Sequence, residues 1–123
     1  MTTVLIIEDN PDNMLLISDI LEANGYSLIR AETGQQGVEL AVAESPAFII
    51  LDIQLPDING YEVLGGIRAA ERTRSIPVVA MTSYAMAGDR ERLMAAGCDG
   101  YVEKPIDPGK VMEQIKQAVG KSE

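Results

Sequence analysis

The sequence predicts an α/β domain built on a doubly wound, five-stranded parallel sheet whose two faces are covered by helices. Short apolar runs alternate regularly with longer helical patterns, and each kind of segment occurs five times. This alternation is typical of a parallel sheet with crossover helices, and right-handed crossovers leave only doubly wound topologies plausible. The 123 residues contain no linker, repeat or low-complexity segment, so we expect one domain over residues 1–123.

The apolar runs are the expected strands. Continuous apolar runs of this length are typical of strands that are buried on both faces. They are VLII at 4–7, YSLI at 26–29, FIIL at 48–51, PVVAM at 77–81 and GYV at 100–102.

Capping residues mark the expected helices. A side chain that accepts a hydrogen bond, often followed by proline, is typical of a helix start, and glycine is typical of a helix end. The expected starts are Asn10-Pro11, Thr33, Asp57 or Asn59, and Asp107-Pro108, and the expected ends of the first, fourth and fifth helices are Gly25, Gly97 and Gly120.

Composition and charge exclude several classes of function. Nineteen Asp and Glu residues against ten Lys and Arg give a net charge of −9, which argues against direct binding of nucleic acid. The chain has no histidine, which excludes imidazole catalysis, histidine-ligated metal sites and a histidine phosphodonor within the chain. No apolar run approaches the roughly 20 residues of a membrane span, and MTTVLII has no basic signal region. We therefore expect a cytoplasmic protein without a membrane partner.

The single cysteine, Cys98, excludes an internal disulfide and a multi-cysteine metal site. It is either a redox-sensitive thiol or a small buried apolar residue. We expect the second, because free cysteine is usually buried.

Polar residues stand where the expected strands end. In doubly wound sheets, ligands bind outside the carboxyl ends of the strands. We therefore expect three acids, two hydroxyls and one lysine to converge at one edge, with Asp52 emerging from the core into a crevice. The residues after the first, third, fourth and fifth strands are Glu8-Asp9, Asp52, Thr82-Ser83 and Glu103-Lys104-Pro105.

Three clustered carboxylates repel one another. At ~4 Å and an effective dielectric constant of ~20, each pair costs on the order of 4 kcal/mol, so a proton or a cation must compensate. Mg²⁺ suits such a set, because it prefers hard oxygen ligands and uses one or two carboxylates together with a phosphate. The alternative is an acidic surface cluster in which Asp9 and Asp57 cap neighbouring helices. With a cation bound, Asp52 is a candidate nucleophile for an acyl phosphate, and Lys104 and Thr82 could hold the phosphoryl oxygens.

The segments VLIIEDN, FIILDIQLPDINGYE, VVAMTSYA and GCDGYVEKPI resemble those of a response-regulator receiver domain, the CheY-like family of two-component signalling, over essentially the whole chain. The order, spacing and strand placement of the segments make the resemblance specific. It implies a flavodoxin-like (βα)5 fold with strand order 2-1-3-4-5. It also implies phosphotransfer from a histidine kinase or histidine phosphotransfer protein onto Asp52, in a signalling protein that only assists its own phosphorylation and dephosphorylation.

The resemblance further assigns roles to single residues. Mg²⁺ is bound directly by Asp9 and Asp52, by the backbone carbonyl of Gln54, and indirectly by Glu8. Lys104 pairs with the phosphoryl group, and the Lys104–Pro105 peptide bond is cis.

A switch and an output face are implied as well. Thr82 moves toward the phosphoryl group and Tyr101 swings inward to fill the vacated space, as a two-state element biased by a local change in charge. A downstream protein target binds the face made by the fourth helix, fifth strand and fifth helix. Stand-alone receivers and receivers excised from hybrid kinases both fit the sequence.

Single residue positions help to distinguish a receiver domain from proteins with rival functions. A haloacid-dehalogenase-like phosphatase needs a second aspartate two residues after its nucleophile, where this chain has Gln54, which cannot act as a general acid. A non-phosphorylated adaptor on a receiver scaffold stays open. Gln54 and Tyr84 flank the expected path of hydrolytic water, and our hypothesis is that the bulk of Tyr84 lengthens the phosphoryl lifetime.

Overall fold

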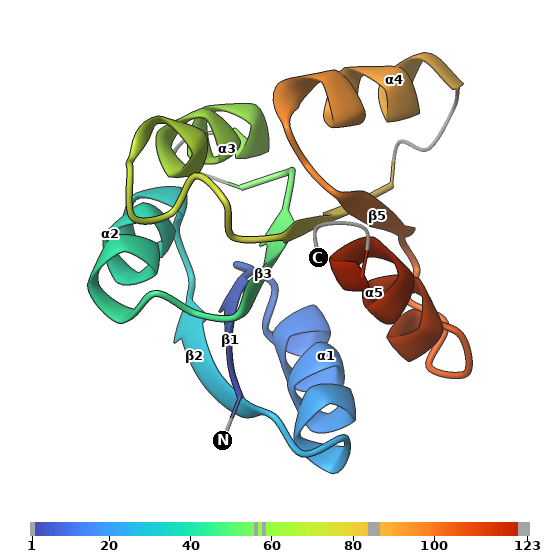
Figure 1. Cartoon of the computed structure of the whole chain (residues 1–123). Coiled ribbons are helices and arrows are strands. Elements are labelled where there is room, and N and C mark those ends of the chain that lie inside the picture. The colour runs from blue at the N-terminus through green and yellow to red at the C-terminus, as the bar shows by residue number, and fades with distance from the viewer. Residues whose placement is uncertain (1, 56, 58, 84–86, 121–123) are drawn as a thin grey trace.

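The computed structural model describes residues 2–55, 57, 59–83 and 87–120. Strands and helices alternate strictly along these residues (Figure 1). The elements are β1 (Thr3–Ile7), α1 (Pro11–Ala23), β2 (Ser27–Ala31), α2 (Gly34–Glu44), β3 (Phe48–Asp52), α3 (Gly60–Ala69), β4 (Val78–Thr82), α4 (Ala87–Ala96), β5 (Gly100–Glu103) and α5 (Val111–Gly120). All strand pairs are parallel, in the order β2-β1-β3-β4-β5, which confirms the predicted fold class and strand order. Within the described part of the chain, the helices lack the length and apolarity that spanning a membrane requires.

The structure decides between the two starts predicted for the third helix and contradicts the start predicted for the fifth. Asn59 caps α3, and its side chain accepts a hydrogen bond from the N–H of Glu62 at 3.1 Å. Asp107-Pro108 does not open α5, which begins at Val111. A turn intervenes because the Asp107 side chain accepts the N–H of Gly109 and its carbonyl accepts the N–H of Val111, both at 2.9 Å.

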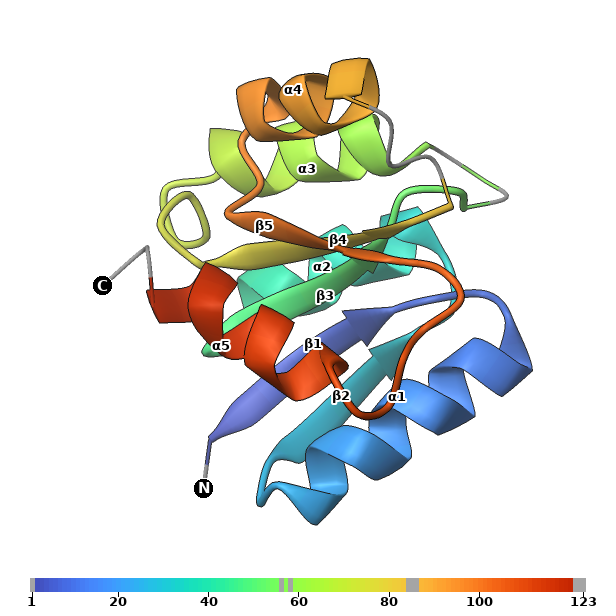
Figure 2. The ribbon, with the colours of Figure 1, turned by 90° about the vertical axis from the view of Figure 1, so that its right-hand side faces the viewer.

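Two helical layers cover the sheet. Helices α1 and α5 lie on one face, and α2, α3 and α4 lie on the other (Figure 2). Side chains alternate between the layers: Leu5 and Ile7 of β1 pack toward α2, α3 and α4, whereas Val4 and Ile6 pack toward α1 and α5.

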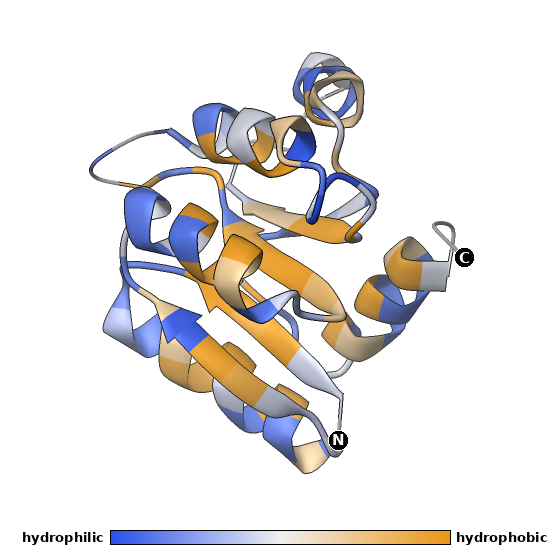
Figure 3. Cartoon of the chain, turned by 60° about the vertical axis from the view of Figure 1, so that its left-hand side comes forward, coloured by the Kyte–Doolittle hydropathy of each residue, from blue (hydrophilic) through white to orange (hydrophobic). Residues whose placement is uncertain are grey.

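The central strands are buried on both faces. Every residue of β3 and β4 is buried, which explains why their sequences are nearly uniform apolar runs. Figure 3 shows the strands as the most hydrophobic part of the chain, with hydrophilic residues on the outer sides of the helices. Each fully buried aliphatic side chain contributes about 1.5–3 kcal/mol, so the sheet is a rigid support for whatever its rim carries.

The hydrogen-bond ladder of the sheet continues past the strand ends. The backbone N–H groups of Glu8, Ile53 and Lys104 donate to carbonyls of neighbouring strands at 2.9, 3.1 and 2.8 Å. The first residues beyond three strands are therefore held nearly as firmly as the strands themselves.

We predict that Gly60→Ala destabilises the protein. A Cβ atom at Gly60 would lie 2.4 Å from the backbone Cα of Ile53, which cannot move without displacing the segment next to Asp52. We expect the free energy of unfolding, measured by urea denaturation, to fall by roughly 1–3 kcal/mol.

Gly65→Ala is the matched control in the same helix. A Cβ at Gly65 meets nothing within 4 Å, so this change should raise the free energy of unfolding by roughly 0.5–1 kcal/mol. Equal effects of the two substitutions would contradict the packing described here.

Candidate functional site

Asp52 is the last residue of β3, at the carboxyl edge of the sheet. Its Oδ1 accepts hydrogen bonds from Lys104 Nζ and from the N–H of Gln54, both at 2.9 Å. The sequence predicts that Asp52 emerges into a crevice, but only 1% of the residue is exposed. The predicted position at the edge of the sheet is correct, but the predicted exposure is wrong, because Glu8, which follows β1, and Lys104, which follows β5, lie close to the carboxylate.

Glu8 follows β1 and is completely buried. Its Oε1 lies 3.6 Å from Lys104 Nζ and has no hydrogen-bond partner within the described residues. Its Oε2 receives a long hydrogen bond of 3.4 Å from the N–H of Asn10. Lys104 thus pairs with two buried carboxylates, and the hydrogen-bonding capacity of Glu8 is left largely unfilled.

The pKa values of the two carboxyl groups are shifted in opposite directions. Burial, followed by the nearby Asp52, raises the pKa of Glu8 from 4.5 to about 8. Burial also acts to raise the pKa of Asp52, but its interactions with Glu8, the Gln54 N–H and Lys104 outweigh it and lower that pKa below 3.8. At neutral pH, Asp52 therefore carries the negative charge and Glu8 holds the proton.

The acidic cluster has the composition of a site for a hard cation. Glu8, Asp9 and Asp52 each offer an oxygen, and these oxygens lie within 4.8 Å of one another. Two oxygens that bind one Mg²⁺ ion at about 2.1 Å lie about 3–4 Å apart, so small rotamer changes bring this set into range. The orphaned Oε1 of Glu8 also fits a missing positive charge. These residues fit Mg²⁺, and the part of the Gln54 carbonyl stays a prediction.

Thr82 and Tyr101 lie on the neighbouring strands β4 and β5. Thr82 ends β4 one position beyond Met81, which pairs with Asp52, and Thr82 is 1% exposed. Tyr101 of β5 is half-buried, and the guanidinium carbon of Arg90 lies 5.4 Å from the centre of its ring. The Lys104–Pro105 peptide bond is cis.

Asp57 has a role that the sequence left open. Its two carboxylate oxygens accept the N–H groups of Gly34 and Gln35 at 2.8 and 3.0 Å, so it caps α2 from a distant loop. Thr33 satisfies the next two N–H groups of α2, those of Gln36 and Gly37. This tertiary cap ties the loop after Asp52 to the helix on its far side.

Two further expectations can be placed. Cys98 is buried, and burial is the main cause that raises the pKa of its thiol, which supports the structural rather than the redox reading. Gln54 is exposed, whereas Tyr84 lies outside the described residues, so the hypothesis about hydrolytic water stays untested.

A cavity of about 280 Å³ adjoins the acidic cluster, a feature that the sequence analysis did not anticipate. Glu8 and Asp9 line one side of it, and Met14 and Leu15 of α1 line another. Leu15 is a large apolar side chain with 62% exposure, so the approach to the acids is bordered by an uncovered apolar residue.

Comparison with known proteins points in one direction. The family model for the response regulator receiver domain matches residues 4–116. The polar-differentiation response regulator DivK of Brucella ovis is 43% identical over 118 residues, which are 96% of each chain. The receiver domain of a sensor histidine kinase from Pseudomonas aeruginosa, solved with a magnesium ion in its active site cleft, has a TM-score of 0.87 and 33% identity over 97% of this chain and 98% of that one. A putative response regulator from Chloroflexus aurantiacus shares the fold, with a TM-score of 0.90 and 24% identity over 97% and 98% of the two chains.

We predict that Glu8→Gln raises the free energy of unfolding of the metal-free protein relative to wild type, and that this difference grows as the pH rises. The folded protein keeps the Glu8 proton up to about pH 8, whereas the unfolded chain loses it near pH 4.5. Stability contributed by the protonated form is therefore full below pH 4.5 and is lost between pH 4.5 and 8, by up to roughly 1.4 kcal/mol per pH unit. Glutamine escapes this loss, so the difference in free energy of unfolding between variant and wild type should grow from pH 5 to pH 8.

The measurement is urea denaturation in a chelator at several pH values. Glu44→Gln, at an exposed position of α2, is the control and should follow the wild-type profile. Parallel profiles for Glu8→Gln and wild type would show that Glu8 is ionised in the folded state.

We predict that Asp57→Ala lowers the free energy of unfolding by about 1–2 kcal/mol, because two N–H groups of α2 lose their acceptor and the helix dipole loses a charge. Asp57→Asn keeps an acceptor and should cost less. Asp19→Ala on the exposed side of α1 should change stability by no more than about 0.5 kcal/mol. If Asp57→Ala behaves like Asp19→Ala in urea denaturation, the cap contributes nothing.

Proposed function

The chain belongs to the response regulator receiver domain family, whose members are phosphoacceptors in signalling, and we propose that the group accepting the phosphoryl here is the carboxylate of Asp52. The observation that carries the proposal is the pairing of Asp52 with Lys104 at 2.9 Å beside two further acids. Its interactions with Glu8, the Gln54 N–H and Lys104 together lower the pKa of Asp52, so Asp52 stays ionised and hence nucleophilic while Glu8 takes the proton.

The donor is a phosphohistidine on a histidine kinase or histidine phosphotransfer protein, since this chain has no histidine of its own. A carboxylate oxygen of Asp52 attacks the phosphorus, and the phosphorus–nitrogen bond breaks. The imidazole leaves with the bonding electrons and takes up a proton, and an aspartyl phosphate remains. The donor approaches beside the exposed Leu15, because the cavity there is bordered by Glu8 and Asp9.

Lys104 and Thr82 receive the transferred group. Lys104 exchanges its contact with the Asp52 carboxylate for one with a phosphoryl oxygen, as a point charge. The Thr82 hydroxyl donates to another oxygen from the end of the adjacent strand. Most of what phosphoryl transfer requires is such positioning and compensation of charge.

Mg²⁺ is the cofactor in this proposal, bound by the carboxylates of Asp9 and Asp52, by the Gln54 carbonyl, and indirectly by Glu8. When bound, it neutralises the acids and the phosphoryl oxygens that must meet them. Support comes from the oxygen cluster and the orphaned Glu8 Oε1. The related receiver from Pseudomonas aeruginosa, with magnesium in its cleft, supports the same choice of ion.

Output is proposed to run through Thr82 and Tyr101. Movement of Thr82 toward the phosphoryl group opens space beside β5, and the half-buried Tyr101 turns into it. Tyr101 also lines a groove of about 410 Å³ between α4 and α5, together with Met94 and Gln114. A change of the Tyr101 rotamer therefore alters the α4–β5–α5 face, where a downstream protein binds.

The proposal covers residues 1–123 as one receiver domain in the cytoplasm that acts by binding proteins rather than by turning over a substrate. A non-phosphorylated adaptor on the same scaffold is the alternative. The presence of Asp52, Lys104 and Thr82 together at the rim favours the phosphorylated switch.

We predict that incubation with Mg²⁺ and a small acyl phosphate or phosphoramidate adds the mass of one phosphoryl group. Intact mass spectrometry is the measurement. Asp52→Asn and removal of Mg²⁺ by a chelator should each abolish the adduct, because the first removes the nucleophile and the second leaves the acids uncompensated. Asp57→Asn is the control and should retain it, because Asp57 binds the end of α2 instead.

An adduct that persists in Asp52→Asn would place the acceptor elsewhere. Changes in NMR shifts on adding Mg²⁺ and phosphodonor to wild type, without any adduct, would favour the adaptor.

A further inference from the structure

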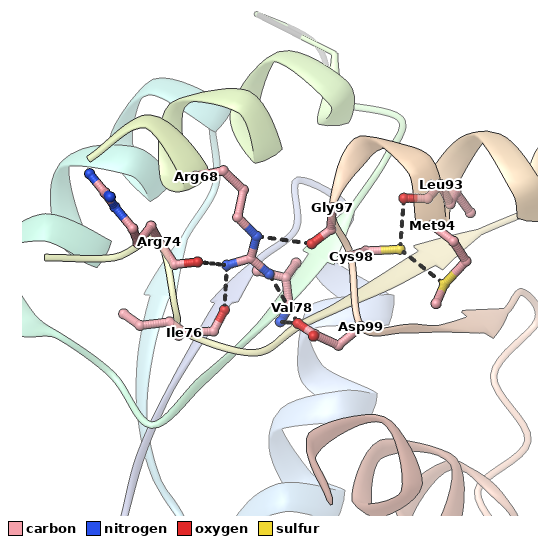
Figure 4. A network of polar contacts seen from close by, with 9 residues as sticks. All are labelled: Arg68, Arg74, Ile76, Val78, Leu93, Met94, Gly97, Cys98 and Asp99. Atoms are coloured by element: carbon pink, nitrogen blue, oxygen red, sulfur yellow. Dashed lines mark hydrogen bonds and ion pairs between the residues drawn. The ribbon is translucent and has the colours of Figure 1, made fainter. Parts of the chain in front are cut away.

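Arg68, in the last turn of α3, makes an unusual number of directed contacts for one side chain (Figure 4). Its Nε donates to the carbonyl of Gly97 at 2.9 Å, and its Nη1 donates to the carbonyls of Arg74 and Ile76 at 3.0 and 2.7 Å. Its Nη2 pairs with Asp99 Oδ2 at 3.0 Å, with both side chains about a quarter exposed. The planar fork of the guanidinium makes such a multiple contact possible, and lysine cannot reproduce it.

The partners of Arg68 lie at the point where α4 ends and β5 begins. Gly97 has a φ of +109°, and the N–H groups of Gly97 and Cys98 donate to the carbonyls of Met94 and Leu93, which is the Schellman arrangement of a helix end. Asp99 Oδ2 also accepts the N–H of Val78 at 2.8 Å, at the start of β4. One arginine thus joins the ends of α3 and α4 to the beginnings of β4 and β5.

The rest of α4 is attached differently. Among residues 88–96, Leu93 is the only buried side chain. Nearer the start of the helix, Arg90 lies over the ring of Tyr101 at 5.4 Å, and Arg92 lies over the ring of Tyr61 at 4.6 Å. These cation–π contacts are weaker than short hydrogen bonds to a charged group.

We infer that Arg68 is a positioning residue that fixes the pivot of α4 at Gly97, so that a turn of Tyr101 swings the beginning of the helix while its end stays in place. The inference rests on the proposed function, because it takes Asp52 phosphorylation as the event that turns Tyr101. Arg68 lies at the rim of the sheet opposite Asp52 and does not touch the reacting groups. In this inference it determines how the α4–β5–α5 face moves.

The test uses ¹⁵N-labelled protein of residues 1–123 and beryllofluoride with Mg²⁺ as the phosphoryl mimic. In wild type, amide shift changes caused by the mimic should be large over residues 88–92 and small over residues 97–99. In Arg68→Lys, which keeps the charge but loses the fork, they should extend through residues 97–99. Arg74→Lys is the control, because the contact of Arg74 with Arg68 uses the backbone carbonyl. The midpoint of the beryllofluoride titration should differ less than two-fold among the three proteins.

A second measurement does not need the mimic. Hydrogen exchange of the Gly97, Cys98 and Asp99 amides should be at least ten-fold faster in Arg68→Lys than in wild type, with unchanged exchange of Ile50 and Leu51 in β3. If exchange at residues 97–99 is unchanged, or if the shift changes stop at the same residue in Arg68→Lys as in wild type, Arg68 does not set the pivot. Absence of any beryllofluoride response in wild type would overturn the proposed function instead, and the exchange result would still decide whether the clamp exists.

Discussion

The ion pair between Asp52 and Lys104 is the contact on which the functional edge of this molecule depends. It joins residues 52 positions apart in the sequence, and both side chains are largely withdrawn from water. A buried charge that loses its partner typically costs 3–5 kcal/mol, so neither residue could occupy its place without the other. Glu8 adds a second acid to the same lysine, and its burial, reinforced by the nearby Asp52, raises its pKa so that its carboxyl keeps a proton. A divalent cation bound at this cluster would compensate the same charges as that proton, and its binding would therefore release the proton.

Most of the fold could be predicted because the sequences of the central strands fit a buried strand and no other element. In β3 and β4 every residue is buried, so the runs FIIL and VVAM are apolar at each position. Such short unbroken runs lack the spacing of three to four residues between apolar positions that would predict an amphipathic helix. The convergence of Glu8, Asp52 and Lys104 followed from parallel topology, which brings the carboxyl ends of strands to one edge. The burial of Asp52 did not follow, since it is produced by side chains from two other strands whose reach is a matter of tertiary geometry.

The contacts that the sequence could not predict are those in which a side chain recognises the backbone of a distant segment. The sequence made Asp57 a candidate both to open the next helix and to cap a neighbouring one, but it did not indicate that the N–H groups of Gly34 and Gln35 would lie beside it. Arg68 lies in an ordinary helical pattern, and three of its four acceptors are carbonyls, which every residue possesses. The start of α5 was misplaced for a related reason: Asp107 uses its side chain and carbonyl in a turn before the helix begins. Local capping rules cannot tell these arrangements apart.

The alternation of β1 side chains between the two helical layers has a consequence for how such proteins diversify. The acidic cluster and Lys104 lie at the rim of the sheet, and the side chains of the strands that lead to them are buried on both faces. The outer surfaces of the helices are therefore free to drift in sequence without disturbing the chemistry. A chain that shares this backbone at 24% identity illustrates how far the sequence can change while the fold is kept. Changes confined to the exterior can accordingly alter what such a scaffold binds while its core and its rim stay the same.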